Sequence, residues 1–463
     1  MNNNTLPQRK TRGRLEVEEA KIIKVNMDEE EQNVEQSGDE METIEMDNEG
    51  GDAVESGATD TAEEVYLPGK PLEEGEELVH DSSAYHMYHA AQTGSPCLSF
   101  DILRDSLGDN RSSYPMTAYL VAGTQAESKK QNFVILLKMS QLTRTDKQTE
   151  SDSEDELEDD EPVLETVMIQ HSGAVNRIRV APLTEHTLIA SWSEKGVVNI
   201  WNGDKHVILL ERPSAGAASK ALTGHKEAPL YTFSGHQSEG FAMDWSATTP
   251  GRLATGDCHS NIHVWKPTDD GSWHVDQRPY SAHTKSVEDI QWSPTEPSVF
   301  ASCSVDGSVR IWDVRAAPSK ACMITCPAHS TDVNVISWNK KEPLLLSGGD
   351  DGLVKVWDLR QIKKGEAAAL FKHHTAPVTS VEWHPSDSTV FASAGDDNQV
   401  VQWDLAVEKE EGPGSSTVDV PPQLLFIHQG QQEIKELHWH PQLTGVLFTT
   451  ALNSFNVFKT ISV

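Results

Sequence analysis

The chain has 463 residues and a formal net charge of −34, so it is long enough for two or three ordinary domains or one large repetitive one. Its five cysteines are scattered and odd in number, which argues against a disulfide framework and for reduced thiols inside a cell. No apolar run approaches the roughly 18 residues of a membrane-spanning helix, and the N-terminus has no apolar signal region, so we expect neither a membrane anchor nor secretion.

The acidic residues are concentrated at the N-terminus. Residues 1–80 hold 23 acidic and 7 basic side chains, a local charge of −16. Such a segment cannot bury enough apolar surface to fold, so we predict an acidic disordered tail. Within it, residues 7–14 (PQRKTRGR) place four basic side chains in a short window, a pattern that is typical of nuclear localisation signals.

The next predicted element is a short N-terminal helix over residues 81–94 (DSSAYHMYHAAQTG). Asp81 can cap its start and Gly94 can end it. At helical spacing, one face carries Ala84, Tyr85, Tyr88 and Ala91. This helix would either pack on the rim of the following domain or supply half of a binding groove.

Two strands are predicted within residues 116–138, and an acidic disordered insertion follows at residues 143–166. Nine of the twelve residues from 150 to 161 are acidic. The candidate client-binding carboxylates are Glu150, Asp152, Glu154, Asp155, Glu156, Glu158, Asp159, Asp160 and Glu161. Ser151 and Ser153 each precede a glutamate by three residues, a pattern that acidophilic kinases favour, so both are phosphorylation candidates.

Three columns of residues keep one period through the rest of the chain. They are Trp265, Trp312, Trp357 and Trp403; Trp245, Trp292, Trp338 and Trp383; and His236, His283, His329 and His374. A period near 45 residues that ends in Trp-Asp is typical of propeller blades. A four-stranded sheet this small cannot bury both faces alone, and packing several blades in a ring solves that problem.

Three blades also repeat a serine, an aspartate and a tryptophan at fixed spacing after the histidine. The sets are His283, Ser302, Asp306 and Trp312; His329, Ser347, Asp351 and Trp357; and His374, Ser393, Asp397 and Trp403. They resemble the structural tetrads of WD40 repeats, in which these side chains hydrogen-bond across a blade. Because the pattern recurs at the blade period, we interpret it as architecture and not as three catalytic triads.

The other blades match the pattern less well. Lys195 stands at the aspartate position of the blade ending at Trp201, and His259 stands there in the blade ending at Trp265. Phe458 replaces the last tryptophan of the C-terminal blade. With a degenerate blade at 116–138, the total is seven. The sequence therefore predicts an all-β fold: a seven-bladed WD40 β-propeller over residues 81–463, with a short N-terminal helix and long acidic disordered segments.

An acidic loop with a double proline is predicted at residues 407–423, before the last blade. It carries Glu408, Glu410, Glu411 and Asp419 ahead of Pro421 and Pro422.

Arg315 and Arg360 each follow a Trp-Asp-x in consecutive blades. Tandem Trp-Asp-x-Arg resembles the signature of substrate receptors of cullin-four ubiquitin ligases, in which such arginines face the ligase adaptor. The simpler interpretation is a solvent-exposed arginine at the end of a strand.

Catalytic motifs are scarce. The chain has no phosphate-binding glycine loop, no zinc-ligand spacing and no nucleophile–base pair outside the tetrads, so we predict no enzymatic activity, no cofactor and no metal. His438 and His440 share one face of a strand and are interpreted as surface or packing residues. A hydrolase that uses carboxylates in the central channel remains an alternative, although no inward cluster of carboxylates stands out in the sequence.

Several stretches from about Val65 onward resemble the glutamate-rich WD-repeat proteins, which are relatives of the retinoblastoma-binding histone chaperones. They are residues 65–105, YLVAGTQAES at 119–128, the acidic insertion, and VPPQLLFIHQG at 420–430. The last stretch is similar to the double-proline loop that faces the N-terminal helix of histone binders. The resemblance implies a groove formed by Tyr85 and Tyr88 with Glu408, Glu410, Glu411, Asp419, Pro421 and Pro422.

The same resemblance implies a nuclear and nucleolar factor in assembly of the large ribosomal subunit. The expected partners are a basic ribosomal protein of the large subunit and core histones, with the cullin-four adaptor as the alternative. Free ribosomal proteins and histones are strongly basic, and an acidic protein competes with nucleic acid for their charges. We expect no direct nucleic-acid site and no membrane contact. We also expect a monomer, because a closed ring has little need of self-association.

Overall fold

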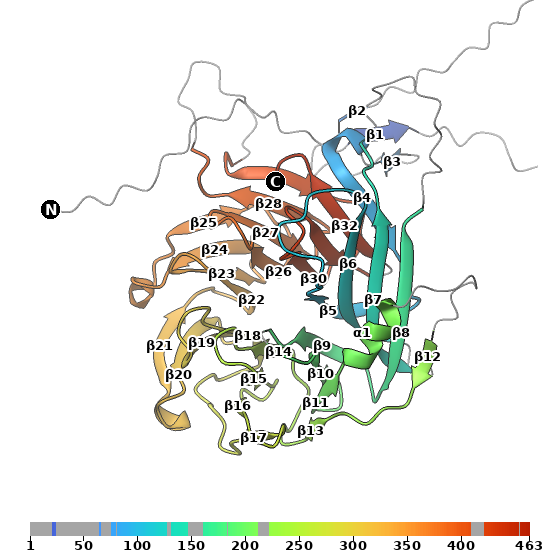
Figure 1. Ribbon diagram of the computed structural model, residues 1–463. Helices are drawn as coiled ribbons and strands as arrows, with labels where there is room; N and C mark the ends of the chain where they lie inside the picture. Colours follow the sequence, from blue (N-terminus) through green and yellow to red (C-terminus); the bar gives the residue numbers. More distant parts are fainter. Residues whose placement is uncertain are drawn as a thin grey trace, which may run out of the picture. The chain divides into compact units, whose positions relative to one another are not determined.

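The computed structural model describes residues 21–24, 64–65, 76–79, 81–126, 131–146, 161–182, 184–211, 222–408, 421–452 and 454–463. The chain divides into two units, one of which spans residues 19–81 and the other of which contains residues 82–463 (Figure 1). No helix within these described residues is long and apolar enough to cross a membrane.

The smaller unit contains a short antiparallel sheet. Its strands are β1 (Lys21–Lys24), β2 (Glu64–Val65) and β3 (Glu76–Val79), in the order β2-β1-β3. We predicted a disordered tail over residues 1–80, so these three strands correct that prediction locally. The rest of the predicted tail lies outside the described residues.

The larger unit is a ring of seven sheets around a central channel (Figure 1), which confirms the predicted propeller. Blade 1 contains β5 (Cys97–Leu103), β6 (Met116–Thr124), β7 (Asn132–Leu142) and β8 (Val163–His171), with β12 (Leu222–His225) added in parallel to β8. Blade 2 contains β9 (Val175–Val180), β10 (Leu188–Ser193), β11 (Val197–Asn202) and β13 (Tyr231–Phe233), and the helix α1 (Asp204–Glu211) follows β11.

The remaining blades follow the sequence repeat. Blade 3 is β14 (Ala242–Trp245), β15 (Leu253–Gly256), β16 (Ile262–Pro267) and β17 (Trp273–Val275); blade 4 is β18 (Val287–Trp292), β19 (Val299–Ser304), β20 (Ser308–Asp313) and β21 (Cys322–Pro327). Blade 5 is β22 (Val333–Trp338), β23 (Leu344–Gly349), β24 (Leu353–Asp358) and β25 (Ala369–Lys372); blade 6 is β26 (Val378–Trp383), β27 (Val390–Gly395), β28 (Val400–Asp404) and β29 (Leu424–His428). Short 3₁₀ turns, η2 (Pro318–Lys320) and η3 (Ile362–Lys364), follow β20 and β24.

Blade 7 is completed by the N-terminal end of the domain. Its strands are β30 (Glu436–Trp439), β31 (Leu447–Thr450), β32 (Phe455–Thr460) and β4 (Tyr85–Ala91), with β4 antiparallel to β32. The predicted helix over residues 81–94 is therefore wrong: only a single 3₁₀ turn, η1 (Ser82–Ala84), precedes a strand. Tyr85 and Met87 are buried two residues apart, so a strand period governs the segment. The open edge of β32 needs a partner, and pairing with it overrides the local helical pattern.

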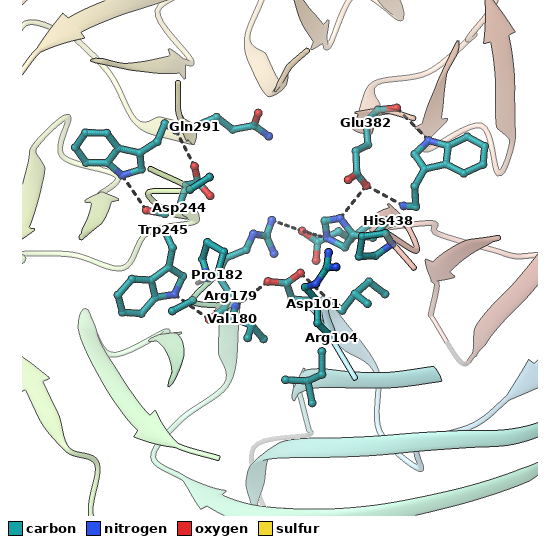
Figure 2. A pocket seen from close by; sticks show the side chains of 18 of the residues that line it. Asp101, Arg104, Arg179, Val180, Pro182, Asp244, Trp245, Gln291, Glu382 and His438 are labelled. Atoms are coloured by element: carbon teal, nitrogen blue, oxygen red, sulfur yellow. Dashed lines mark hydrogen bonds and ion pairs between the residues drawn. The ribbon is translucent and has the colours of Figure 1, made fainter. Parts of the chain in front are cut away.

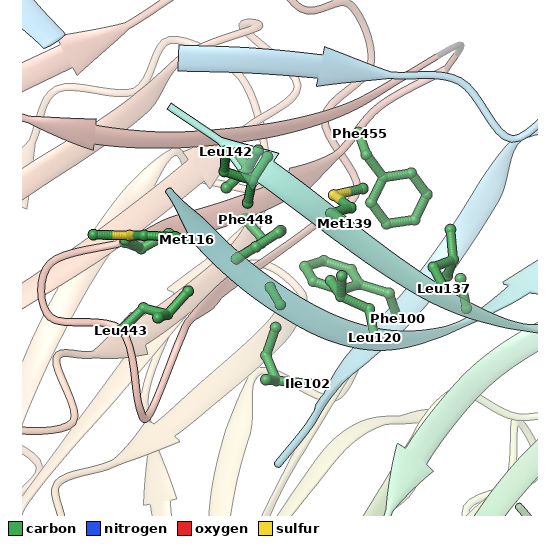
Figure 3. Close-up of a cluster of buried hydrophobic side chains, with 14 of the residues drawn as sticks. Phe100, Ile102, Met116, Leu120, Leu137, Met139, Leu142, Leu443, Phe448 and Phe455 are labelled. Atoms are coloured by element: carbon green, nitrogen blue, oxygen red, sulfur yellow. The ribbon is translucent and has the colours of Figure 1, made fainter. Parts of the chain in front are cut away.

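The seam between blades 7 and 1 is packed with apolar side chains (Figure 3). Phe100, Leu120 and Leu137 of blade 1 and Phe448 and Phe455 of blade 7 belong to one cluster and are at most 2% exposed. Each such side chain contributes about 1.5–3 kcal/mol through burial. The two ends of the domain therefore close the ring through an ordinary hydrophobic core.

A side-chain network crosses each of the regular blades. In blade 4, the Trp312 indole N–H donates to Ser302 Oγ (2.8 Å), Ser302 Oγ bonds His283 Nε2 (2.7 Å), and His283 Nδ1 bonds Asp306 (3.0 Å). The same contacts join His329, Ser347, Asp351 and Trp357 in blade 5, and His374, Ser393, Asp397 and Trp403 in blade 6. Burial opposes ionisation of Asp306, but the hydrogen bonds from His283 and Ser308 hold the pKa of its carboxyl below the usual value.

Blade 3 has a complete network, although the repeat places His259 at the position of the aspartate and predicts a weaker match for this blade. Asp257, not His259, bonds His236 Nδ1 (2.9 Å), and Thr255 takes the place of serine between His236 and Trp265 (both 2.9 Å). Asp257 is fully buried, whereas His259 is exposed. In blade 3 the aspartate of the network therefore lies two residues earlier in the chain than the repeat predicts.

Candidate functional site

The acidic insertion is anchored to the strand that closes the ring. His89 Nε2 bonds the Thr143 carbonyl (2.9 Å), His86 Nδ1 bonds Asp146 (2.9 Å), and the Thr145 N–H donates to the His86 carbonyl (3.1 Å). Residues 143–146 are thus packed against β4, and residues 163–166 belong to β8. Both ends of the predicted insertion at 143–166 are therefore structured. Residues 147–160, with the two candidate serines and eight of the nine candidate carboxylates, lie outside the described residues; Glu161 is exposed.

The double-proline loop has a closed base. The Gln423 side-chain amide donates to the Val407 carbonyl (3.0 Å), and the Asp404 N–H donates to the Gln423 carbonyl (2.9 Å), so the two ends of the loop lie side by side. Glu408 and Pro422 are exposed and Pro421 is half-buried. Glu410, Glu411 and Asp419 lie outside the described residues.

The two groove tyrosines belong to the body of blade 7. Tyr85 is buried, its hydroxyl bonds His428 Nδ1 (2.7 Å), and burial raises the pKa of that hydroxyl well above its ordinary value. The Asn456 amide donates to the Tyr88 hydroxyl (3.1 Å), and Tyr88 stays partly exposed. The structure therefore forms no helical wall for the predicted groove, because this segment is a strand.

The insertions share one face of the propeller. Hydrogen bonds between neighbouring innermost strands advance in step, from Asp289 to Ile336 and from Gln291 to Trp338 for example, so these strands run parallel around the channel. We call the face at which they end the insertion face. It carries the loops after the third strand of each blade, including residues 143–162 of blade 1 and 405–423 of blade 6. β4, the fourth strand of blade 7, also begins there.

The two candidate adaptor-binding arginines lie on the same face, on neighbouring blades. Arg315 follows β20 and pairs with Asp313 (Nε to Oδ1 2.9 Å), and Arg360 follows β24 and pairs with Asp358 (2.8 Å). Their side chains are 74% and 69% exposed. The hydrogen bonds from the arginines lower the pKa of both aspartates. Each arginine is a solvent-exposed group held in the same local geometry.

The central channel contains a cavity of about 660 Å³ that sequence reasoning missed (Figure 2). Each blade contributes one polar residue at the same position of its innermost strand, directly before the tryptophan of the second column or its equivalent. We call these residues the polar ring: Asp101, Arg179, Asp244, Gln291, Ser337, Glu382 and His438. The repeat itself carried the signal, because four of these residues directly precede the tryptophans of the second column.

Five side chains of the polar ring bond the backbone of the next blade. The Asp244 carboxylate accepts the backbone N–H of Trp292 (2.7 Å), Gln291 accepts that of Trp338 (2.7 Å), and Glu382 accepts that of Trp439 (3.0 Å). Ser337 does the same for Trp383 and Asp101 for Val180. Burying these polar groups is tolerated because each is hydrogen-bonded.

Two arginines of blade 2 converge on one buried glutamate of blade 7. Arg177 and Arg179 contact Glu436 Oε1 at 2.7 and 2.6 Å, and the Phe100 N–H donates to Oε2 (2.8 Å). Burial disfavours the Glu436 carboxylate, but the two guanidinium groups hold its pKa well below the ordinary value.

The sequence did not indicate that the pKa values of His438 and Asp244 are strongly raised. Burial disfavours the His438 cation, but Glu382 (3.0 Å) outweighs this and raises the pKa to about 10. Burial raises the pKa of Asp244 to about 8. His438 is therefore a charged channel residue, whereas His440 is a packing residue whose Nδ1 accepts the N–H groups of Gln442 and Leu443. Among the described residues, no group of three or more histidines, cysteines or carboxylates could hold a metal ion.

Comparison with known proteins places the chain in a family. Residues 75–143 match the family model of the "Histone-binding protein RBBP4" and its CAF1-complex counterpart, and residues 275–313, 320–358 and 365–404 match "WD domain, G-beta repeat". The chain is 42% identical to "Ribosome assembly protein rrb1" of Schizosaccharomyces pombe, over 91% of this chain and 90% of the relative. It is 43% identical to "Protein HEAT STRESS TOLERANT DWD 1" of Arabidopsis thaliana, over 85% and 90% of the two chains. Identity to "Glutamate-rich WD repeat-containing protein 1" of Dictyostelium discoideum is 41%, over 84% and 83%. The chain therefore belongs to the family of glutamate-rich WD repeat-containing proteins.

Proposed function

We propose that this protein is a non-enzymatic WD40 scaffold of ribosome assembly, which escorts a strongly basic client in the nucleus and nucleolus. The names of its relatives support ribosome assembly, and the match of residues 75–143 to a histone-binding family supports histones as a second class of client. The proposed clients are a basic ribosomal protein of the large subunit and core histones.

One structural observation carries the proposal. The acidic insertion, the start of β4 with the acidic tail before it, and the acidic double-proline loop join the propeller on blades 1, 7 and 6, three consecutive blades, and all on the insertion face. Their negative charges are therefore tethered around one sector of a rigid ring. A basic client bound at this sector would lie near the points at which all three segments are attached to the propeller.

The electrostatics fit such a task. A free ribosomal protein or histone binds nucleic acid through phosphate contacts, and a tethered polyanion competes for the same lysines and arginines. Attraction between opposite fields raises the association rate and is weakened by salt. We infer that the acidic segments capture and shield the client while the propeller surface supplies specificity.

The test replaces residues 148–160 by a neutral Gly/Ser segment of equal length. We expect weaker binding of a large-subunit ribosomal protein and of histone H3–H4, together with a smaller dependence of affinity on salt. A variant with the same residues in scrambled order keeps the charge and should bind as the wild type does. Unchanged affinity and unchanged salt dependence in the neutral variant would reject the electrostatic part of the proposal.

A second candidate function rests on Arg315 and Arg360. Both are exposed, held by the same aspartate pairing, and carried by blades 4 and 5 of the insertion face. This arrangement suits a substrate receptor of a cullin-four ubiquitin ligase. Co-purification of the ligase adaptor should be lost in an Arg315→Ala, Arg360→Ala double variant and kept in a Lys340→Ala variant on the same face. Adaptor binding that is indifferent to the double change would reject this function.

A further inference from the structure

A patch of positive charge lies on blades 4 and 5 of the insertion face. It consists of seven exposed cations in the loops of these two blades that reach this face. We call them the basic patch: Arg315, Lys320, Lys340, Lys341, Arg360, Lys363 and Lys364. The loops and the strand ends that carry them hold five carboxylates, two of which pair with the arginines. Cations therefore outnumber carboxylates here, although the whole chain has a net charge of −34.

The loops that carry the patch are packed together. The Leu359 N–H donates to the Pro343 carbonyl (2.9 Å), so the two loops of blade 5 on this face lie side by side. The turn η3, which includes two of the lysines, packs against β21 of blade 4. The cations of the two blades therefore form one surface.

The lysines of the patch are available to a ligand. None of the five forms an ion pair with a residue that the structure describes. Lys341 donates one hydrogen bond to the Ser386 carbonyl (2.6 Å), and Lys364 donates one to the Gln361 side chain (2.7 Å). An ammonium group has three donors, so each of these two lysines can still bind an anion.

Trp338 differs from the other tryptophans of the second column. Trp245, Trp292 and Trp383 are buried, and each donates its indole N–H to a carbonyl oxygen of the preceding blade. Trp338 is half-buried, and within the described part of the chain its indole N–H has no acceptor. Trp338 and Lys340 both line the channel cavity, where β22 ends on the insertion face. A partly exposed aromatic ring therefore adjoins the basic patch.

The patch is set apart from the attachment point of the acidic insertion. In Figure 1, blades 4 and 5 (β18–β25) lie across the ring from β7 and β8 of blade 1, between which the insertion stands. The double-proline loop, on blade 6, is the acidic segment next to the patch. Salt at 0.1 M screens exposed charges beyond roughly 10 Å, so a polyanion at the patch is governed mainly by the local cations.

We propose that the basic patch binds single-stranded RNA, with phosphates at the lysines and a base stacked on Trp338. Lysines on neighbouring loops match a chain of phosphates. An aromatic ring beside them supplies the stacking surface on which single strands are held, whereas an acidic peptide would gain only from the lysines. The proposal revises the expectation of no direct nucleic-acid site. It also goes beyond the proposed function, because the protein would hold a basic client and an RNA on different sectors of one face.

The experiment measures the fluorescence anisotropy of a labelled oligouridine of about 12 nucleotides with the full-length protein, at several salt concentrations. The test variant combines Lys340→Gln, Lys341→Gln, Lys363→Gln and Lys364→Gln. We expect its affinity to fall about tenfold or more, and the salt dependence (log affinity against log salt) to decrease by about 0.7 for each lysine that contacts a phosphate.

A matched control removes the same charge elsewhere. It changes four exposed lysines outside the patch to glutamine: Lys226, Lys266, Lys285 and Lys372. This variant should bind the oligouridine as the wild type does. Arg315 and Arg360 are left intact in both variants, so the result is independent of the ligase-adaptor candidate.

Trp338→Leu tests the aromatic part of the site. We expect it to weaken oligouridine binding about tenfold, the loss typical of one stacked base. Binding of an abasic oligomer of equal length should not change, because that probe has phosphates but no bases. If Trp338→Leu fails to fold, the wild type alone still decides, since it should bind oligouridine more tightly than the abasic oligomer.

Three results would overturn the proposal. They are no oligouridine binding by the wild type at about 0.1 M salt, binding that the patch variant retains in full, and equal affinity for an aspartate peptide of the same charge. Because residues 148–160 are unchanged throughout, each of these would leave the proposed function standing. Failure of the neutral-segment experiment would, in turn, leave the RNA site standing.

Discussion

Trp292 contacts Asp244 of the preceding blade twice: its backbone N–H donates to the carboxylate (2.7 Å) and its indole N–H to the carbonyl oxygen (3.1 Å). Trp439 bonds Glu382 in the same two ways. The second tryptophan column is therefore the tie between neighbouring blades, just as the first column is the tie within a blade. The residue directly before each tryptophan of the second column belongs to the polar ring and faces the channel.

Asp244→Asn should stabilise the protein increasingly as the pH rises. Burial raises the Asp244 pKa from 3.8 to about 8, with Arg179 lowering it and Asp289 and Asp101 raising it further. The folded state therefore favours the protonated form, and a penalty for ionisation grows between these two pH values. Asparagine avoids the penalty and keeps an oxygen for the Trp292 N–H. Thermal melts at pH 5, 6, 7 and 8 should show a gain in Tm that widens with pH; a constant difference would contradict this.

His438→Gln should have the opposite pH dependence. The His438 pKa is raised from 6.5 to about 10, so its cation stabilises the fold fully below the lower value, and the contribution is lost as the pH rises through the upper one. Removing it leaves Glu382 without its cation, at a cost of roughly 3 kcal/mol. Chemical denaturation at pH 6 should reveal this loss, and at pH 10 the difference from the wild type should be much smaller.

The blade-3 network predicts unequal effects at two nearby residues. Asp257→Ala removes the partner of His236 Nδ1 in a fully buried site and should cost roughly 1–3 kcal/mol of unfolding free energy. His259→Ala changes an exposed residue and should have almost no effect. Urea denaturation of both variants measures this, and equal losses would show that His259 takes part in the network after all.

Tyr85 should act on stability and not on client binding. It is 4% exposed within the last blade, so Tyr85→Ala should cost roughly 3–5 kcal/mol, whereas Tyr85→Phe loses the bond to His428, worth roughly 1 kcal/mol. Denaturation curves give both values. Client affinity, measured at a temperature at which each variant is folded, should be unchanged. A loss of affinity without a loss of stability would place Tyr85 in a groove.

The sequence predicted the parts of the fold that depend on repetition. Trp312, Trp357 and Trp403 recur because each caps the same network, so the blade period could be read directly. Non-repeated contacts were not predictable in this way. Tyr85, Tyr88 and Ala91 fit a helical period, whereas Tyr85 and Met87 fit a strand, and only the open edge of β32, far away in the sequence, decides between the two.

The same holds for the candidate site: the positions of the channel residues follow from the repeat, whereas their pKa values do not. Asp244, Gln291 and Glu382 stand at one fixed position of the repeat, directly before a tryptophan, so that position could have been recognised as lining a channel. The pKa values and ion pairs of the individual residues could not be predicted in this way. The pKa of His438 depends on Glu382 in the neighbouring blade, and Glu436 is held by arginines that come from the other end of the domain.

Because β4 pairs with β32, the first strand of the propeller to leave the ribosome is the last to find its partner. Synthesis runs from the N-terminus, so blades 2 to 6 can form while β4 waits for residues 455–460. Until then the nascent chain exposes two unpaired strand edges, which invite wrong pairing. A protein that we propose binds newly made basic clients is therefore itself an open ring during its synthesis, with strand edges that need protection from wrong pairing.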